Sequence, residues 1–143
     1  MSGDLPDVNL LLALAWPNHQ FHGPARRWFA DRSGTWITCP LTQLGFVRLS
    51  SNPAFTPHAK TPLEATLLLA AMTAHPQHRF LADSEAVASE VFQHLAGRLE
   101  GHQQLTDAYL VALAMSNEAR LVTFDRRIDA ICPVAGTVLV LDA

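Results

Sequence analysis

Short β-prone runs alternate with helical periods along the chain, and this alternation restricts the possible folds more than any other feature of the sequence. The β-prone runs lie at 35–39, 79–81, 120–124 and 137–141, with a very short one that ends at Asp7. Apolar periodicity, bounded by prolines, predicts helices at 8–15, 24–31, 41–51, 62–74, 84–95 and 104–118. Strands that alternate with helices form parallel sheets, so we expect a parallel sheet that helices cover on both faces.

Chain length and composition indicate one folded domain. With 143 residues the chain can bury one substantial core but not two, so we expect residues 1–143 to form a single domain. Hydrophobic residues make up 49% of the chain and charged residues 16%, which excludes intrinsic disorder. No apolar stretch approaches the roughly 18 residues of a membrane span, and the N-terminal segment is acidic where a secretory signal is basic. We therefore expect a cytoplasmic protein without membrane association.

Charge and cysteine content narrow the function further. The formal net charge of -3 argues against a general nucleic-acid binder, which presents a broad basic surface. Neighbouring arginines such as Arg126 and Arg127 still allow local cationic patches. Cys39 and Cys132 lie far apart without metal-ligand spacing, so we expect small buried side chains or free thiols.

Three aspartates stand where a parallel sheet places its functional residues. Asp7 follows the first short strand, Asp107 lies in the first turn of the helix at 104–118, and Asp125 follows the strand at 120–124. Functional sites form outside the carboxyl ends of parallel strands, so we expect the three carboxylates to meet at that edge of the sheet. Taken singly, each acid is better explained as a helix cap or a surface carboxylate than as a site residue.

Three carboxylates at one sheet edge repel one another, and a cation resolves that repulsion. Mg2+ and Mn2+ prefer oxygen ligands, so this cluster suits either ion, with Asp7, Asp107 and Asp125 as the metal ligands. Such an ion lowers the pKa of a water, polarises a phosphoryl oxygen and stabilises a leaving oxygen. The chain has no glycine-rich phosphate loop and no nucleophilic serine or cysteine motif. The acids therefore predict metal-dependent hydrolysis of phosphodiesters.

Four segments read, in order, DVNLLLALAWPNH from Asp7, CPLTQLGFVRL from Cys39, LTDAYLVALA from Leu105 and LVTFDRRI from Leu121. Together they resemble the four motif regions of PIN-domain proteins, specifically the toxins of the VapC type. The resemblance covers essentially the whole chain. It implies a three-layer α/β/α fold around a short parallel sheet and an endoribonuclease activity that depends on Mg2+ or Mn2+.

The resemblance also implies roles for individual residues. Asp7 matches the first acid of the family pattern, Asp107 the helix acid that joins it at the metal, and Asp125 the acid after the late strand. Thr123 matches a residue whose hydroxyl commonly supports that last acid. Asn9 corresponds to a frequent asparagine two places after the first acid.

One acid of the family pattern is missing. Members usually carry a glutamate in the helix at 41–51, where this sequence has Gln43 or Gly45 and no carboxylate. Gln43 can hydrogen-bond a water of the cation through its amide oxygen, so we retain it as a candidate catalytic residue. Glu64 and Asp83 are possible substitutes, but helix capping or solvation explains each of them better.

For partners, the resemblance implies the toxin of a type II toxin-antitoxin system that cleaves structured RNA such as tRNA or rRNA. A VapB-type antitoxin would occlude the site, and a homodimer is expected because PIN toxins commonly pair. The missing acid supports a second hypothesis, a catalytically silent PIN module that binds RNA or a protein partner.

Two further classes fit the sequence less well. An aspartate-dependent phosphotransfer domain is disfavoured because the first acid reads DVN rather than D-x-D, and because Lys60, the only lysine, is poorly placed. A zinc enzyme is disfavoured because the close histidine pairs, His19 with His22 and His75 with His78, lack the further ligand that zinc needs.

Overall fold

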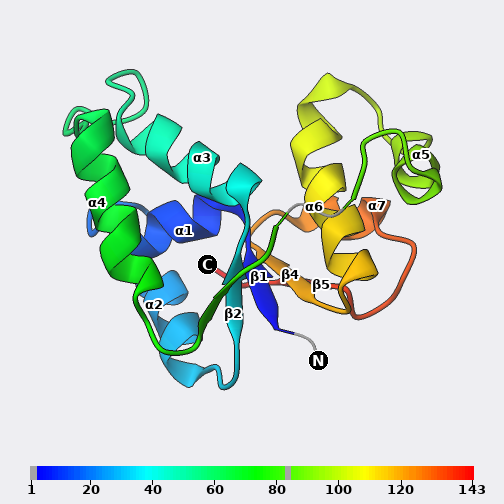
Figure 1. Cartoon of the computed structure of the whole chain (residues 1–143), viewed down its shortest axis with the longest axis horizontal. Helices are drawn as coiled ribbons and strands as arrows, with labels where there is room; N and C mark the ends of the chain where they lie inside the picture. The colour runs from blue at the N-terminus through cyan, green and yellow to red at the C-terminus, as the bar shows by residue number, and fades with distance from the viewer. Residues whose placement is uncertain (1–2, 83–84) are drawn as a thin grey trace.

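A sheet of five parallel strands forms the centre of the computed structural model, which describes residues 3–82 and 85–143 (Figure 1). The strands are β1 (Asp4–Pro6), β2 (Trp36–Thr38), β3 (His78–Phe80), β4 (Arg120–Thr123) and β5 (Val138–Val140). Their order across the sheet is β3-β2-β1-β4-β5. Each strand falls on one of the β-prone runs of the sequence, so the predicted parallel sheet is confirmed.

Helices cover both faces of this sheet. On one side lie α1 (Val8–Ala15), α2 (His22–Asp31), α3 (Pro40–Ser50) and α4 (Pro62–Thr73). On the other side lie α5 (Glu90–Ala96), α6 (Leu105–Ser116) and α7 (Arg126–Ile131), and the short 3-10 helix η1 (His102–Gln104) leads into α6 (Figure 1). The expected three-layer α/β/α fold is therefore confirmed.

The central strands contribute side chains to the hydrophobic clusters on both faces of the sheet, because successive side chains point to opposite faces. In β4, Leu121 packs into the cluster with α6, whereas Val122 packs into the cluster with α1 and α2. In β2, Ile37 likewise packs into the cluster with α6, whereas Trp36 packs on the opposite face, in a cluster with α1. All four side chains are almost fully buried. Each such burial stabilises the fold by roughly 1.5 to 3 kcal/mol, which holds β2 and β4 between the helical layers.

The strand order reverses between β1 and β4. From β1 the chain adds β2 and β3 on one side of the sheet and then places β4 and β5 on the other. Pro6 in β1 lies opposite Val122 in β4, so the two strands end side by side. In open α/β sheets, ligands bind outside the carboxyl ends of the strands at such a reversal.

The predicted helix at 84–95 is wrong at its start, because α5 begins only at Glu90. Ser89 caps this helix, accepting a hydrogen bond from the backbone N–H of Phe92 at 3.2 Å. The preceding segment is held against α6 instead, where Tyr109 donates to the backbone oxygen of Glu85 and Ser116 donates to its carboxylate. The proposed cap at Asp83 lies outside the described residues.

The other helix boundaries agree with the prediction to within about two residues. α6 ends at Ser116 rather than at the predicted position 118, since Glu118 adopts a positive φ of 53° and leaves the helix. At the start of α4, Thr61 and Glu64 form a reciprocal capping box, with distances of 2.8 and 3.1 Å. Glu64 is thus occupied as a helix cap, as its position in the sequence indicates.

The longest helices in residues 3–82 and 85–143 are α4 and α6, with 12 residues each. None of the helices in these ranges has the length and apolar character needed to cross a lipid bilayer.

Candidate functional site

Asp7 links the carboxyl ends of β1 and β4. Its backbone N–H donates to the oxygen of Val122 at 3.0 Å, which continues the pairing of the two strands. One carboxylate oxygen, Oδ1, accepts from the backbone N–H of Leu10 at 2.9 Å and caps α1. The other, Oδ2, accepts from the hydroxyl of Thr123 at 2.5 Å. Asp7 is therefore a helix cap and, at the same time, a fixed carboxylate at the reversal of the sheet.

The environment of Asp7 disfavours its negative charge. The residue is only 6% exposed, and burial raises its pKa to about 6. Hydrogen bonds from Thr123 and Leu10 lower the pKa, but the nearby carboxylates of Asp107 and Asp125 raise it again. Among the residues that the structure describes, the charges that act on this pKa are those of Asp107 and Asp125, and none is cationic. A positive ion beside Asp7 would relieve both the burial and the repulsion.

Asp107 lies in the first turn of α6, where the partial positive charge of a helix N-terminus stabilises a carboxylate. The residue is half-buried. Burial raises its pKa, and the neighbouring charge of Asp125 adds to the rise, whereas Arg127 lowers it. Asp107 thus shares the electrostatic environment of Asp125 although the two belong to different helices.

Asp125 caps α7, and the hydrogen bonds of its carboxylate all come from one residue, Arg127. Its Oδ1 accepts from the backbone N–H of Arg127 at 2.9 Å and from Nε of the same residue at 3.0 Å. Its Oδ2 accepts from Nη2 of Arg127 at 2.9 Å. These hydrogen bonds to the guanidinium hold the pKa of Asp125 below its usual value. Of the three acids, Asp125 is the one with a cationic partner.

Thr123, the last residue of β4, joins two of the acids. Its hydroxyl donates to Asp7 and accepts from the backbone N–H of Asp125 at 3.0 Å. The side chain is fully buried, so water cannot replace either hydrogen bond. The structure therefore places Thr123 between the first acid and the last, as a residue that fixes both.

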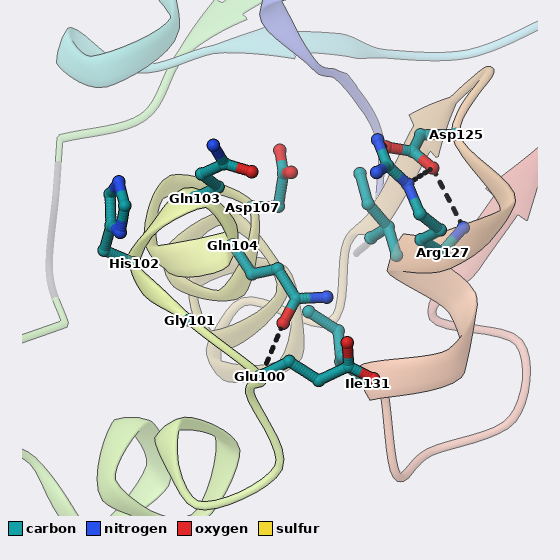
Figure 2. A pocket seen from close by; sticks show the side chains of 10 residues that line it. Glu100, Gly101, His102, Gln103, Gln104, Asp107, Asp125, Arg127 and Ile131 are labelled. Carbon is teal, nitrogen blue, oxygen red and sulfur yellow. Dashed lines mark hydrogen bonds and ion pairs between the residues drawn. The ribbon is translucent and has the colours of Figure 1, made fainter.

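Asp7, Asp107 and Asp125 line one cavity of about 350 Å3, together with Asn9 and Thr123. A second cavity of about 380 Å3 is lined by Asp107 and Asp125 as well, and by Arg127. Figure 2 shows this second cavity between the start of α6, with Asp107, and the start of α7, with Asp125 under the guanidinium of Arg127. The three acids thus come together at one edge of the sheet, as expected from the sequence.

Gln43 does not line either of these cavities. From the first turns of α3, its amide nitrogen donates to the hydroxyl of Thr38 at 2.9 Å, and that hydroxyl also lies 2.7 Å from Nε2 of His78. Gly45 packs against α1, where a Cβ atom would stand only 2.7 Å from Cγ2 of Val8. Neither Gln43 nor Gly45 supplies a carboxylate. No other residue of α3 is acidic, so this helix offers no substitute for the missing acid.

The donor set suits a hard divalent cation in its chemistry. Carboxylate oxygens are the ligands that Mg2+ and Mn2+ prefer, and two of the three carboxylates have a raised pKa. Within residues 3–82 and 85–143, however, no three His, Cys, Asp or Glu side chains are grouped closely enough to hold an ion as they stand. Asp125 is paired with Arg127, so an ion shared by the three acids competes with this guanidinium for the oxygens of Asp125.

The sequence indicated a local cationic patch at Arg126 and Arg127, but not the separate contacts of the two arginines or the other residues around the site. The two neighbouring arginines differ in role, since Arg127 pairs with Asp125 whereas Arg126 pairs with Asp142 at 2.9 Å. The second cavity is lined by Gln103 and Gln104, which directly precede α6. Their position just before the helix that carries Asp107 is the only signal in the sequence that could have indicated them.

Comparison with known proteins gives a consistent result. A profile described as PIN domain matches residues 5–132 of the chain. Ribonuclease VapC38 of Mycobacterium tuberculosis is 44% identical over 122 residues, which cover 85% of this chain and 84% of the relative. Ribonuclease VapC44 of the same organism is 40% identical over 134 residues, or 92% of each chain.

Among solved structures, the chain is similar to the crystal structure of Mycobacterium tuberculosis VapC20, described as a Sarcin-Ricin loop cleaving toxin. The TM-score is 0.68, and the match covers 89% of this chain and 93% of the other. Since the sequences are only 17% identical, this likeness concerns the fold.

Proposed function

The chain belongs to the PIN domain family, among its VapC ribonucleases, and from this premise we propose that it is a metal-dependent endoribonuclease with its active site at Asp7, Asp107 and Asp125. The substrate is a phosphodiester bond of structured RNA such as tRNA or rRNA. Residues 1–143 act as one domain in the cytoplasm, as the toxin of a type II toxin-antitoxin system.

The burial of Asp7 beside two further carboxylates is the observation that carries this proposal. The negative charge of this carboxylate destabilises the fold, because the residue is 6% exposed, burial raises its pKa to about 6 and the charges that act on it are those of Asp107 and Asp125. The same arrangement is what a hard cation requires. Acids with shifted pKa values that line a cavity where the strand order reverses are typical of catalytic sites.

Each site residue has a distinct task in this proposal. Asp7 and Asp107 hold the cation, directly or through water, and Asp125 completes the acidic site. Thr123 orients Asp7 through its hydroxyl and fixes the backbone at Asp125. Mg2+ or Mn2+, when bound, supplies a Lewis acid that activates water and stabilises the charge of the reacting phosphodiester. The role of Gln43 towards a water of the cation stays a prediction.

The RNA strand lies over both cavities in this proposal. The second cavity shares Asp107 and Asp125 with the first, so a nucleotide next to the scissile phosphate would enter it. Gln103 and Gln104 offer amide groups that can hydrogen-bond base edges or 2′-hydroxyls. Hydrolysis is expected to leave a 5′-phosphate on one product.

Two protein partners are part of the proposal, a VapB-type antitoxin and a second copy of this chain. Support comes from α3 and α4, which pack against each other and carry exposed apolar side chains. Leu44, Leu63 and Leu67 are 63%, 67% and 59% exposed. Apolar side chains that gather on a surface mark protein interfaces.

The proposal is tested by RNA cleavage with matched variants. The chain, purified after separation from its antitoxin, is incubated with tRNA and rRNA in Mg2+ or Mn2+, alongside Asp107→Asn and Asp129→Asn. Asp129 is an exposed acid on α7 that lines neither cavity, so its variant should cleave as the wild type does. Cleavage that persists undiminished in Asp107→Asn would refute the assigned site. Growth arrest on induction, relieved by Asp107→Asn alone, is the corresponding test in cells.

A second candidate function, a silent PIN module that binds RNA without cutting it, is favoured by the absence of a carboxylate in α3. Gln43 stands in the helix where the family pattern has its glutamate, and its amide is engaged by Thr38. RNA that is retained by the wild type but stays intact at high Mn2+ concentration would support this alternative over the nuclease.

A further inference from the structure

Arg127 is the only lysine or arginine that lines either of the two acidic cavities in the described ranges. Its guanidinium hydrogen-bonds both oxygens of Asp125, at 3.0 Å from Nε and 2.9 Å from Nη2. Its charge also acts on Asp107, whose pKa it lowers. One side chain therefore supplies the positive charge of this site.

This contact stands in the way of a shared cation. No three acidic or histidine side chains of the described ranges are placed to hold an ion, and both oxygens of Asp125 are already used by Arg127. Arg127 occupies three of the roughly four acceptor sites of this carboxylate, so Asp125 can present both oxygens to an ion beside Asp7 and Asp107 only if the guanidinium moves away. The ion and Arg127 are thus alternative partners of the same carboxylate.

The exposure of the pair indicates which partner prevails. The side chain of Arg127 is 84% exposed and that of Asp125 31%, and ion pairs in such exposed positions contribute little stability. A divalent ion carries twice the charge and interacts with three carboxylates at once, so its attraction to the site is the stronger one. Arg127 has solvent on its outer side into which it can move.

We infer that Arg127 is the internal counterion of the metal-free site, which holds Asp125 until a divalent cation binds and then gives way to it. The inference rests on the proposed metal site and adds a residue to it. Arg127 is in this sense a positioning residue, because it holds the carboxylate of Asp125 against α7 while no ion is present. The same contact lowers the affinity of the site for the ion.

The neighbouring Arg126 provides a matched control. It stands on the same helix, carries the same charge and pairs with a carboxylate, but that carboxylate is Asp142, which lines neither acidic cavity. Arg127→Gln and Arg126→Gln therefore change the net charge equally, and only the first releases Asp125.

Mg2+ binding without RNA tests the inference, measured by titration calorimetry on the full chain and these two variants. Arg127→Gln should bind Mg2+ roughly 3- to 10-fold more tightly than the wild type, because a competing partner and a like charge are removed. Arg126→Gln should stay within about twofold of the wild type. Equal affinities of all three proteins, or an equal gain in both variants, would overturn the exchange while leaving the metal site intact.

A spectroscopic measurement follows the contact itself. The Nε–H of Arg127 should give a protected side-chain NMR signal in the metal-free chain, which Mg2+ weakens or shifts, whereas the signal of Arg126 stays in place. An Arg127 signal that is unchanged at saturating Mg2+ would also overturn the exchange. If none of the proteins binds Mg2+ and Asp107→Asn behaves as they do, the metal site of the proposed function fails, and the inference fails with it.

Discussion

Asp7 and Asp125 occupy the same local position in two neighbouring regions of the molecule. Each follows a central strand, β1 or β4, and each caps the helix that comes next. Their electrostatic environments are opposite. Asp7 is buried without a cation and its pKa is raised to about 6, whereas Asp125 is partly exposed, bonded to Arg127, and has a lowered pKa.

The difference shows that the local motif determines where a carboxylate stands and the surrounding packing determines what it can do. Both caps satisfy backbone N–H groups equally well, at 2.9 Å from Leu10 and from Arg127. Only Asp7, however, is held in a place where its charge is unfavourable until a cation arrives. In the proposed site, the buried cap is therefore the part that a cation would stabilise, and the exposed cap is already stabilised by Arg127.

Replacement of Asp7 by asparagine should have the largest effect and should separate activity from stability. Asparagine can still cap α1 through its amide oxygen, with its amide nitrogen turned to the hydroxyl of Thr123, but it offers no negative charge to a cation. Cleavage should fall by roughly 100-fold or more, while the metal-free protein becomes more stable at pH 8. RNA cleavage and urea unfolding measure the two effects, with Asp129→Asn as the control. A variant that loses activity and stability together would show that Asp7 has a structural role only.

The stability of the metal-free protein should depend on pH through Asp7. The unfolded chain releases this proton near pH 3.8 and the folded chain only near pH 6, so between these values a rise in pH favours unfolding. The free energy of unfolding, compared with that of Asp7→Asn, should therefore fall by roughly 3 kcal/mol from pH 4 to pH 7 and then level off. Urea titrations at several pH values measure this difference. A difference that does not change with pH would contradict the unfavourable charge of the buried cap.

Replacement of Thr123 by valine should weaken both caps at once. Valine keeps the shape of the side chain but removes the hydroxyl that donates to Asp7 and accepts from the N–H of Asp125. The loss should cost about 1 to 3 kcal/mol, because both partners are left without a hydrogen bond in a buried place. Thr123→Ser, which retains the hydroxyl, is the control and should keep most of the activity. Equal activity in the two variants would argue against a positioning role for this hydroxyl.

The fold and the meeting of the acids could be predicted because they depend on local sequence. An aspartate that directly follows a strand must stand at the carboxyl edge of a parallel sheet, and this places Asp7 and Asp125. Asp107 is placed by its position in the first turn of α6. The resemblance to the family predicted that the hydroxyl of Thr123 supports the last acid; this hydroxyl accepts from the backbone N–H of Asp125 and donates to the carboxylate of the first acid, Asp7.

What could not be predicted depends on contacts between distant parts of the chain. The start of α5 was placed too early because Glu85 is tied to Tyr109 and Ser116 of α6, which no local pattern indicates. The amide of Gln43 is directed to Thr38, whose hydroxyl also contacts His78, 40 residues further along the chain. The rise in the pKa of Asp7 likewise comes from burial, which results from the packing of two helical layers.

Replacement of Asp125 by asparagine should change stability much less than replacement of Asp7. Asparagine still caps α7, and the lost pair with Arg127 is exposed, so the free energy of unfolding should change by under about 1 kcal/mol. Cleavage should nevertheless fall, because the acidic site loses a charge. Urea unfolding at pH 8 compares this variant with Asp7→Asn. A gain in stability equal to that of Asp7→Asn would mean that the two caps are electrostatically alike.

A glutamate at position 43 would add a third carboxylate to the comparison and should have the smallest effect. The hydroxyl of Thr38 can donate to this glutamate while it accepts from His78, so stability should change by less than about 1 kcal/mol. Because Gln43 lines neither acidic cavity, cleavage and its Mg2+ dependence should change by less than about fivefold. Gln43→Leu, which cannot hydrogen-bond Thr38, is the control for local packing. A gain of 100-fold in Gln43→Glu would instead mean that the missing acid limits the natural chain, and the silent module would then become the better description of it.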